Sequence, residues 1–90
     1  MFWVYILKNP DCIYYKGFTE NLPKRFKQHN NDEGRFTAEK GPWVLVYVKS
    51  FETKRAALIE EKRVKRLNKE SLERLISGNS NEITTIDLAS

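Results

Sequence analysis

The 90-residue sequence predicts a mixed α/β domain with three strands and three helices. Two kinds of pattern support this fold class. Three segments are apolar on both alternating faces, as in strands covered on both sides. Three others begin at a residue that can cap a helix and continue with apolar residues at helical spacing. A chain of this length has room for one core, so we expect a single domain over residues 1–77 and a flexible tail over 78–90.

The first two strands are expected to form a hairpin. Phe2 to Lys8 is the first strand, Asn9-Pro10-Asp11 is a turn signal, and Ile13 to Gly17 follows as the second strand. A three-residue loop would set Tyr5 directly opposite Tyr15, and opposed residues of an antiparallel pair share a face. The hairpin therefore predicts two phenols on one surface of the sheet.

The first helix and the third strand follow. Asn21 can cap a helix that tolerates Pro23 in its first turn and ends near residue 30 or 31. Residues 32–42 are polar and predict a loop. Trp43 to Phe51 is again apolar on both faces and predicts the third strand.

Two helices complete the fold. Thr53 can cap a long basic helix that reaches about Leu67. Asn68 can cap a last helix with Gly78 at its end, after which the tail begins.

Composition indicates the cellular compartment in which the protein is expected. No apolar run, Trp43 to Val48 included, approaches the roughly 20 residues that span a bilayer, so no membrane helix is expected. The chain begins without the features of a secretory signal. Cys12 is the single cysteine, so an internal disulfide is impossible and a reducing cytoplasm fits best.

The charge of the chain is basic and unevenly spread. Residues 78–90 contain Glu82 and Asp87 and no Lys or Arg, so residues 1–77 hold 16 basic and 10 acidic residues, a net charge of +6. Clusters of this kind indicate a polyanion such as nucleic acid, although solvated lysines would give the same counts. The clustered residues are Lys24, Arg25, Lys27, Lys62, Arg63, Lys65, Arg66 and Lys69.

Helical spacing places two polar residues of the first helix next to its buried face. Leu22 and Phe26 define its buried face, and Arg25 and His29 lie at or beside that same face. An arginine in such a place either pairs with a carboxylate inside the fold or lines a cleft. A lone histidine there can equally be a hydrogen-bonded residue at the helix end.

A glutamate interrupts the apolar side of the long helix. Ala57, Glu61, Val64 and Asn68 follow one helical seam, and Glu60 lies close to it. Such a carboxylate can pair with a neighbouring Arg or Lys. It can also bind a hard cation, since one carboxylate plus waters and phosphate oxygens is a usual way to hold Mg²⁺.

Several motifs in order resemble those of the GIY-YIG nuclease domain. They are "VYIL" (4–7), "YYKG" (14–17), "NLPKRFKQH" (21–29), "RFT" (35–37), "LVYVKSF" (45–51) and "ALIEEKRVK" (57–65). The likeness covers roughly residues 2 to 77 and is greatest to the small, single-domain bacterial branch related to the nuclease module of the excision-repair incision subunit. Two departures are "VYI" in place of "GIY", and Phe18 where the excision-repair relatives have a lysine.

The resemblance implies an α/β (α+β) fold, a three-stranded antiparallel sheet packed with about three helices. It also implies a metal-dependent endonuclease that hydrolyses DNA phosphodiester bonds with one Mg²⁺ or Mn²⁺ ion, in DNA repair or recombination. The alternative is a nucleic-acid-binding module of nuclease descent with little or no catalysis. Duplex or branched DNA is the expected partner, together with an unidentified protein that supplies specificity. No membrane or small-molecule cofactor is expected.

By position, the family's functional residues fall on named residues of this chain. The expected catalytic residues are Tyr5, Tyr15, Arg25, His29 and Glu61, with Glu61 also the metal ligand. Which tyrosine acts as the base stays open. Gly17 is expected to be structural, either allowing close approach of another group or forming a turn. The expected nucleic-acid contacts are Lys24, Lys27, Thr37, Lys62 and Lys65.

Overall fold

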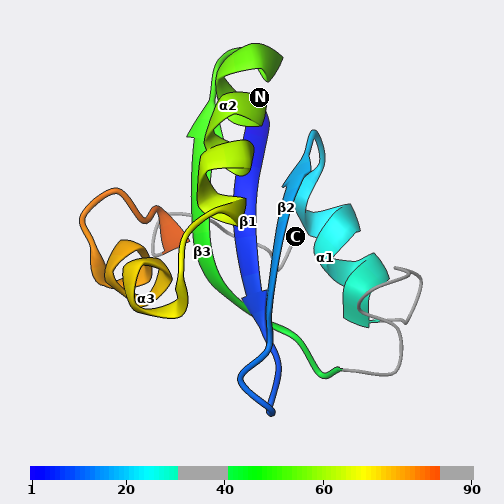
Figure 1. Cartoon of the computed structure of the whole chain (residues 1–90). Helices are drawn as coiled ribbons and strands as arrows, with labels where there is room; N and C mark the ends of the chain where they lie inside the picture. Colours follow the sequence, from blue (N-terminus) through cyan, green and yellow to red (C-terminus); the bar gives the residue numbers. More distant parts are fainter. Residues whose placement is uncertain (31–40, 84–90) are drawn as a thin grey trace.

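The computed structural model describes residues 1–30 and 41–83, and these form one three-stranded sheet with three helices (Figure 1). The strand order is β2-β1-β3 and both pairings are antiparallel, so the expected fold class is confirmed. The elements are β1 (Phe2–Lys8), β2 (Tyr14–Thr19), α1 (Leu22–Asn30), β3 (Val44–Phe51), α2 (Lys54–Lys65) and α3 (Lys69–Ser77). No helix within the described residues is long and apolar enough to cross a membrane.

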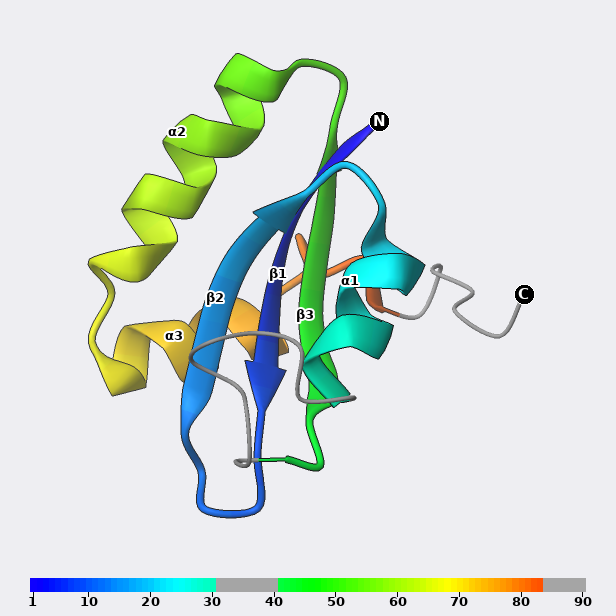
Figure 2. The same ribbon diagram turned by 90° about the vertical axis from the view of Figure 1, so that its right-hand side faces the viewer.

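The sheet is covered on both faces, which explains why its strands are apolar on both. Val4 and Ile6 of β1 pack with Tyr47 and with residues of α2 and α3. Tyr5 and Leu7 point the other way and pack with Leu22 of α1. Figure 2 shows α1 in front of the sheet, α3 behind it and α2 beside β2.

The register of the hairpin differs from the expected one. Tyr5 is opposite Gly17, and Tyr15 is opposite Leu7. The loop runs from residue 9 to 13 instead of closing in three residues. The side-chain oxygen of Asn9 accepts hydrogen bonds from the backbone N–H of Asp11 (3.0 Å) and of Ile13 (2.8 Å) and so holds the longer loop. A slip of two residues preserves the face of every side chain, so both tyrosines still share one surface.

The expected helix caps are present. The side-chain oxygens of Asn21, Thr53 and Asn68 accept hydrogen bonds from the backbone N–H of Lys24 (3.2 Å), Ala56 (3.2 Å) and Ser71 (2.8 Å). Each bond satisfies an N–H that has no partner within its helix. Gly78 is the C-cap of α3, as the sequence indicates.

The chain beyond α3 returns to the sheet, in contrast to the tail expected from residue 78. The amide side chain of Asn81 donates to the carbonyl of Val46 (2.9 Å) and accepts from the N–H of Val48 (3.2 Å). The N–H of Glu82 donates to the carbonyl of Val48 (2.8 Å), and its carboxylate accepts from the Ser50 hydroxyl (2.8 Å). Because an amide side chain can replace a neighbouring strand, this segment covers the outer edge of β3. Residues 84–90 lie outside the described residues.

Candidate active site

Tyr5 and Gly17 form the base of the site. Tyr5 is 1% exposed, and its ring lies against the backbone of Gly17 on the neighbouring strand. A Cβ atom at residue 17 would stand 2.5 Å from the phenol oxygen of Tyr5 and 2.6 Å from its Cζ. Gly17 lies inside β2, so close approach of the tyrosine, and not a turn, is what requires glycine here.

Arg25 joins the two tyrosines. It projects from α1, and its guanidinium group hydrogen-bonds to the hydroxyls of both Tyr5 and Tyr15. The ring centroids of Tyr5 and Tyr15 are 6.2 Å apart. The structure thus brings together three of the predicted site residues from β1, β2 and α1, which we call the tyrosine–arginine cluster.

The electrostatics of this cluster favour a neutral Tyr5 phenol and a charged Arg25 guanidinium. Burial raises the pKa of Tyr5 well above the ordinary value of a phenol, and the nearby Tyr15 raises it further, while Arg25 opposes both effects. Burial alone would lower the pKa of Arg25, but its hydrogen bonds to Tyr5 and Tyr15 leave that pKa raised. Tyr5 is therefore protonated at neutral pH.

Two hollows border the cluster. Tyr15 is partly exposed and lines a hollow of about 240 Å³ together with Tyr14, Lys16 and Lys65. We call this the Tyr15 hollow. Arg25 lines a second hollow, of about 280 Å³, at the start of α1. The cluster is thus reached from two sides, and Tyr15 is its more exposed phenol.

The two adjacent glutamates of α2 have different partners. Both carboxylate oxygens of Glu60 accept hydrogen bonds from the guanidinium of Arg63, at 2.6 and 2.9 Å, and these bonds lower the pKa of Glu60. Glu61 is 19% exposed and pairs with Lys65, with an Oε2–Nζ distance of 3.6 Å. Within the described residues, Glu61 makes no direct hydrogen bond or ion pair with the tyrosine–arginine cluster. Its partner Lys65 borders the same hollow as Tyr15.

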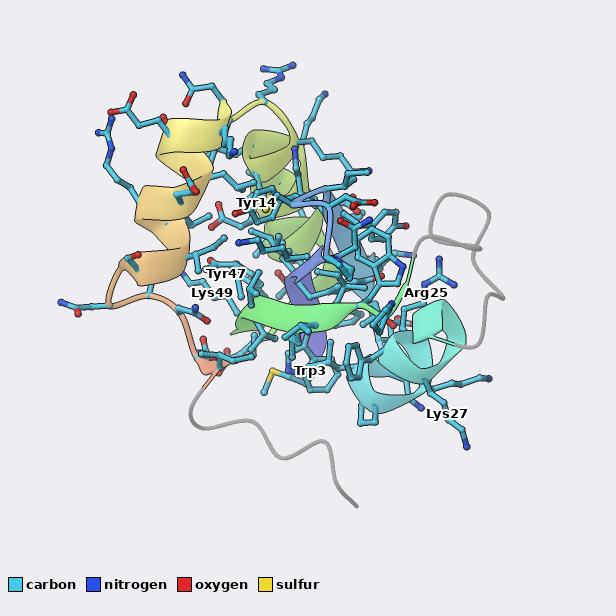
Figure 3. The ribbon with its side chains drawn as sticks, turned by 90° about the horizontal axis from the view of Figure 1, so that it is seen from below. Trp3, Tyr14, Arg25, Lys27, Tyr47 and Lys49 are labelled. Atoms are coloured by element: carbon cyan, nitrogen blue, oxygen red, sulfur yellow. The ribbon has the colours of Figure 1, made fainter. Side chains whose placement is uncertain are left out.

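The remaining predicted residues are spread over the surface or lie outside the described residues. Lys24, Lys27 and Lys62 are exposed on α1 and α2. Figure 3 shows Lys27 pointing away from the sheet, on a different side of α1 from Arg25. The side chain of His29, and Thr37 as a whole, lie outside what the structure describes.

Sequence reasoning missed two residues that border the site. Tyr14 and Lys16 flank Tyr15 along β2 and line the same hollow. Their position next to Tyr15 in the "YYKG" motif was the available signal. No group of three or more metal-ligating side chains occurs in residues 1–30 and 41–83, so a cation would here have to rely on a single carboxylate with waters and substrate oxygens.

Comparison with known proteins identifies the protein family of this chain. The family described as "GIY-YIG catalytic domain" matches residues 1–75. The chain therefore belongs to the GIY-YIG family, a nuclease family whose members generally use a divalent metal. The resemblance found in the motifs is confirmed.

Within this family the relatives of the chain are UPF0213 proteins. One from Clostridium perfringens (strain 13 / Type A) is 46% identical over 81 residues, which cover 89% of this chain and 87% of the relative. Another from Oceanobacillus iheyensis is 41% identical over 66 residues, covering 72% and 77%. The solution NMR structure of the UPF0213 protein from Bacillus halodurans has a TM-score of 0.60 at 32% identity and covers 100% of this chain and 99% of that one.

Proposed function

We propose that this protein is a metal-dependent endonuclease that hydrolyses DNA phosphodiester bonds and acts in DNA repair or recombination in the cytoplasm. The observation that carries the proposal is the tyrosine–arginine cluster, in which Arg25 hydrogen-bonds to two neighbouring tyrosines and one of them, Tyr5, packs on Gly17. Hydrolysis of a phosphodiester needs an activated water and charge relief for the phosphoryl oxygens, and a base beside an arginine can provide both.

Tyr15 is the better candidate for the base. The phenol of Tyr5 is buried and its raised pKa keeps it protonated, so its role is to hold the cluster in place. Tyr15 reaches the Tyr15 hollow, where a water and a phosphate could approach it. To accept the proton of the attacking water, Tyr15 would have to act as the phenolate, and Arg25, hydrogen-bonded to that oxygen, would stabilise its negative charge until the proton arrives. His29, one turn further along α1, is the proposed group that moves this proton onward.

Arg25 is the proposed contact to the phosphoryl oxygens of the substrate. Its guanidinium presents five N–H donors in a planar fork whose geometry matches a phosphate. A paired contact of this kind is one that lysine cannot reproduce.

Glu61 is the proposed metal ligand. Its carboxylate has one weak, long ion pair, whereas Glu60 is held at both oxygens by Arg63, so Glu61 is the more available oxygen donor of the two. One carboxylate completed by waters and phosphate oxygens suits a single Mg²⁺ or Mn²⁺ ion. When bound, such an ion would offset charge on the phosphoryl and leaving oxygens.

Basic residues around the site would position the DNA. Lys24 and Lys27 on α1 and Lys62 and Lys65 on α2 are exposed and are proposed to contact phosphates, with Thr37 as a further contact. These contacts carry no sequence information, so a protein partner is proposed to supply specificity.

The test is nicking of supercoiled plasmid and of branched DNA by the purified protein with Mg²⁺ or Mn²⁺, compared with Glu61→Ala. The proposal requires metal-dependent product that Glu61→Ala does not form. Absence of cleavage by the wild-type protein under all of these conditions would overturn it.

A second candidate function is binding of nucleic acid with little or no catalysis. Phe18 stands where the excision-repair relatives have a lysine, and its ring stacks on Phe2 with centroids 6.1 Å apart, so β2 offers no cation at that position. The same experiment separates the two functions, because a binding module would retard the DNA in a gel without nicking it.

A further inference from the structure

Lys65 lies between the proposed metal ligand Glu61 and the Tyr15 hollow. Its ammonium is 3.6 Å from the carboxylate of Glu61 one turn back along α2. It also lines the Tyr15 hollow with Tyr14, Tyr15 and Lys16. The C-terminal end of α2 extends to the side of β2 in Figure 2, which is why a side chain from this helix can reach the edge of the sheet.

A metal ion on Glu61 would compete with this ammonium for the same carboxylate. A divalent cation on Glu61 and the ammonium of Lys65 are both positive, and repulsion between them prevents both from contacting one carboxylate oxygen at the same time. The pair is long and Lys65 is 55% exposed, so the ion pair is weak and its side chain is free to turn elsewhere.

We propose that Lys65 occupies the cation's position on Glu61 until a metal ion enters, and that the displaced ammonium then turns into the Tyr15 hollow. There it joins Lys16, the residue next to the proposed base along β2, at an edge of the sheet where two ammonium groups suit a phosphate of the substrate. This inference rests on the proposed nuclease function, which supplies the metal ion at Glu61 and the substrate phosphate. It makes Lys65 a positioning residue that links cation binding to the readiness of the phosphate site.

The proposal is tested by titrating the ¹⁵N-labelled protein with Mg²⁺ at constant ionic strength, without DNA, and following its backbone amide signals. Lys65→Met should lower the Mg²⁺ concentration for half-saturation at the amides flanking residue 61 by roughly two- to fivefold, the factor that corresponds to an exposed ion pair. Lys62→Met removes the same charge from the same helix and should change this concentration by less than half as much. Lys65→Arg keeps a partner for Glu61 and should not lower it.

The same spectra report the movement of the side chain. In the wild-type protein the amides of Tyr15 and Lys16 should shift together with those near residue 61, whereas in Lys65→Met only the signals near residue 61 should shift. Equal effects of Lys65→Met and Lys62→Met, or no Mg²⁺-dependent shift near residue 61 in Lys65→Met, would overturn the proposal. No DNA is present, so this result stands apart from the plasmid assay, where failure would count against the nuclease function alone.

Discussion

Gly17 is the residue whose replacement should most directly damage the site. An added methyl group would meet the phenol of Tyr5 at 2.5 Å, so Gly17→Ala must move that ring and weaken its packing. We expect a loss of about 1 to 3 kcal/mol in the free energy of unfolding, the usual cost of overpacking. Urea denaturation measures it.

Gly78→Ala is the matched control for that change. A Cβ atom at residue 78 would come no closer than 3.3 Å to a backbone oxygen, and the residue has an ordinary negative φ. Its effect on stability should be well below that of Gly17→Ala. Equal stability of Gly17→Ala and the wild-type protein would contradict the close contact described here.

Arg25 should matter for rate more than for stability. Arg25→Lys keeps the charge but loses the paired hydrogen bonds, which should raise the barrier by about 2 to 4 kcal/mol, as for one lost oxyanion donor. Single-turnover cleavage should then fall about 100-fold or more. The melting temperature is measured on the same samples, because a variant that is destabilised yet cleaves normally when folded would exclude a catalytic Arg25.

Tyr5 should make the fold sensitive to alkali. Its pKa is raised in the folded state, so the folded protein holds a proton that the unfolded chain releases above about pH 10. The contribution to stability is therefore complete below about pH 10 and is lost as the pH rises further towards the folded pKa. Denaturation measured from pH 8 to 11 should show a shallower decline for Tyr5→Phe, and an unchanged decline would contradict this origin.

At the scale of elements, the sequence predicted helix caps and the faces of residues well, and the hairpin register poorly. Caps depend on one side chain and a nearby N–H, so Thr53 and Asn68 were readable. The loop length depends on Asn9 accepting two backbone bonds and on Cys12 adopting a φ of 62°, neither of which composition reveals. Helical spacing was enough to predict that Arg25 lies beside the buried face of α1. The ion-pair partners of Glu60 and Glu61 could not be predicted, because several Lys and Arg residues lie within reach of each carboxylate and the side-chain conformations decide which one pairs.

Helix α2 carries a paired test of its two glutamates. Glu61→Gln should abolish metal-dependent cleavage with little change in melting temperature, because its ion pair with Lys65 is long and exposed. Glu60→Gln should reduce helix stability slightly through Arg63 and leave metal-dependent cleavage in place. Calorimetry of Mg²⁺ binding to the DNA complexes provides the check, since loss of binding in Glu60→Gln alone would reverse the assignment.

At the scale of the whole molecule, the basic body should make DNA binding strongly dependent on salt. Residues 1–77 carry a net charge of +6, and phosphate contacts release counterions from the duplex. The logarithm of the affinity should fall linearly with the logarithm of the salt concentration, and Lys27→Ala should reduce the slope by up to about one unit. Fluorescence anisotropy measures the slope, and a salt-independent affinity would contradict an electrostatic interface.

The return of residues 81 and 82 to β3 extends the folded domain beyond the end of α3. The family match ends at residue 75, yet the bonds from Asn81 and Glu82 satisfy Val46, Val48 and Ser50 on the outer strand. A chain shortened after residue 77 would retain every helix and strand and expose those backbone groups to other molecules. Such a shortened chain would also lose Ile83, which packs against the core residues on the α1 side of the sheet, so an open strand and a smaller core would both favour its self-association.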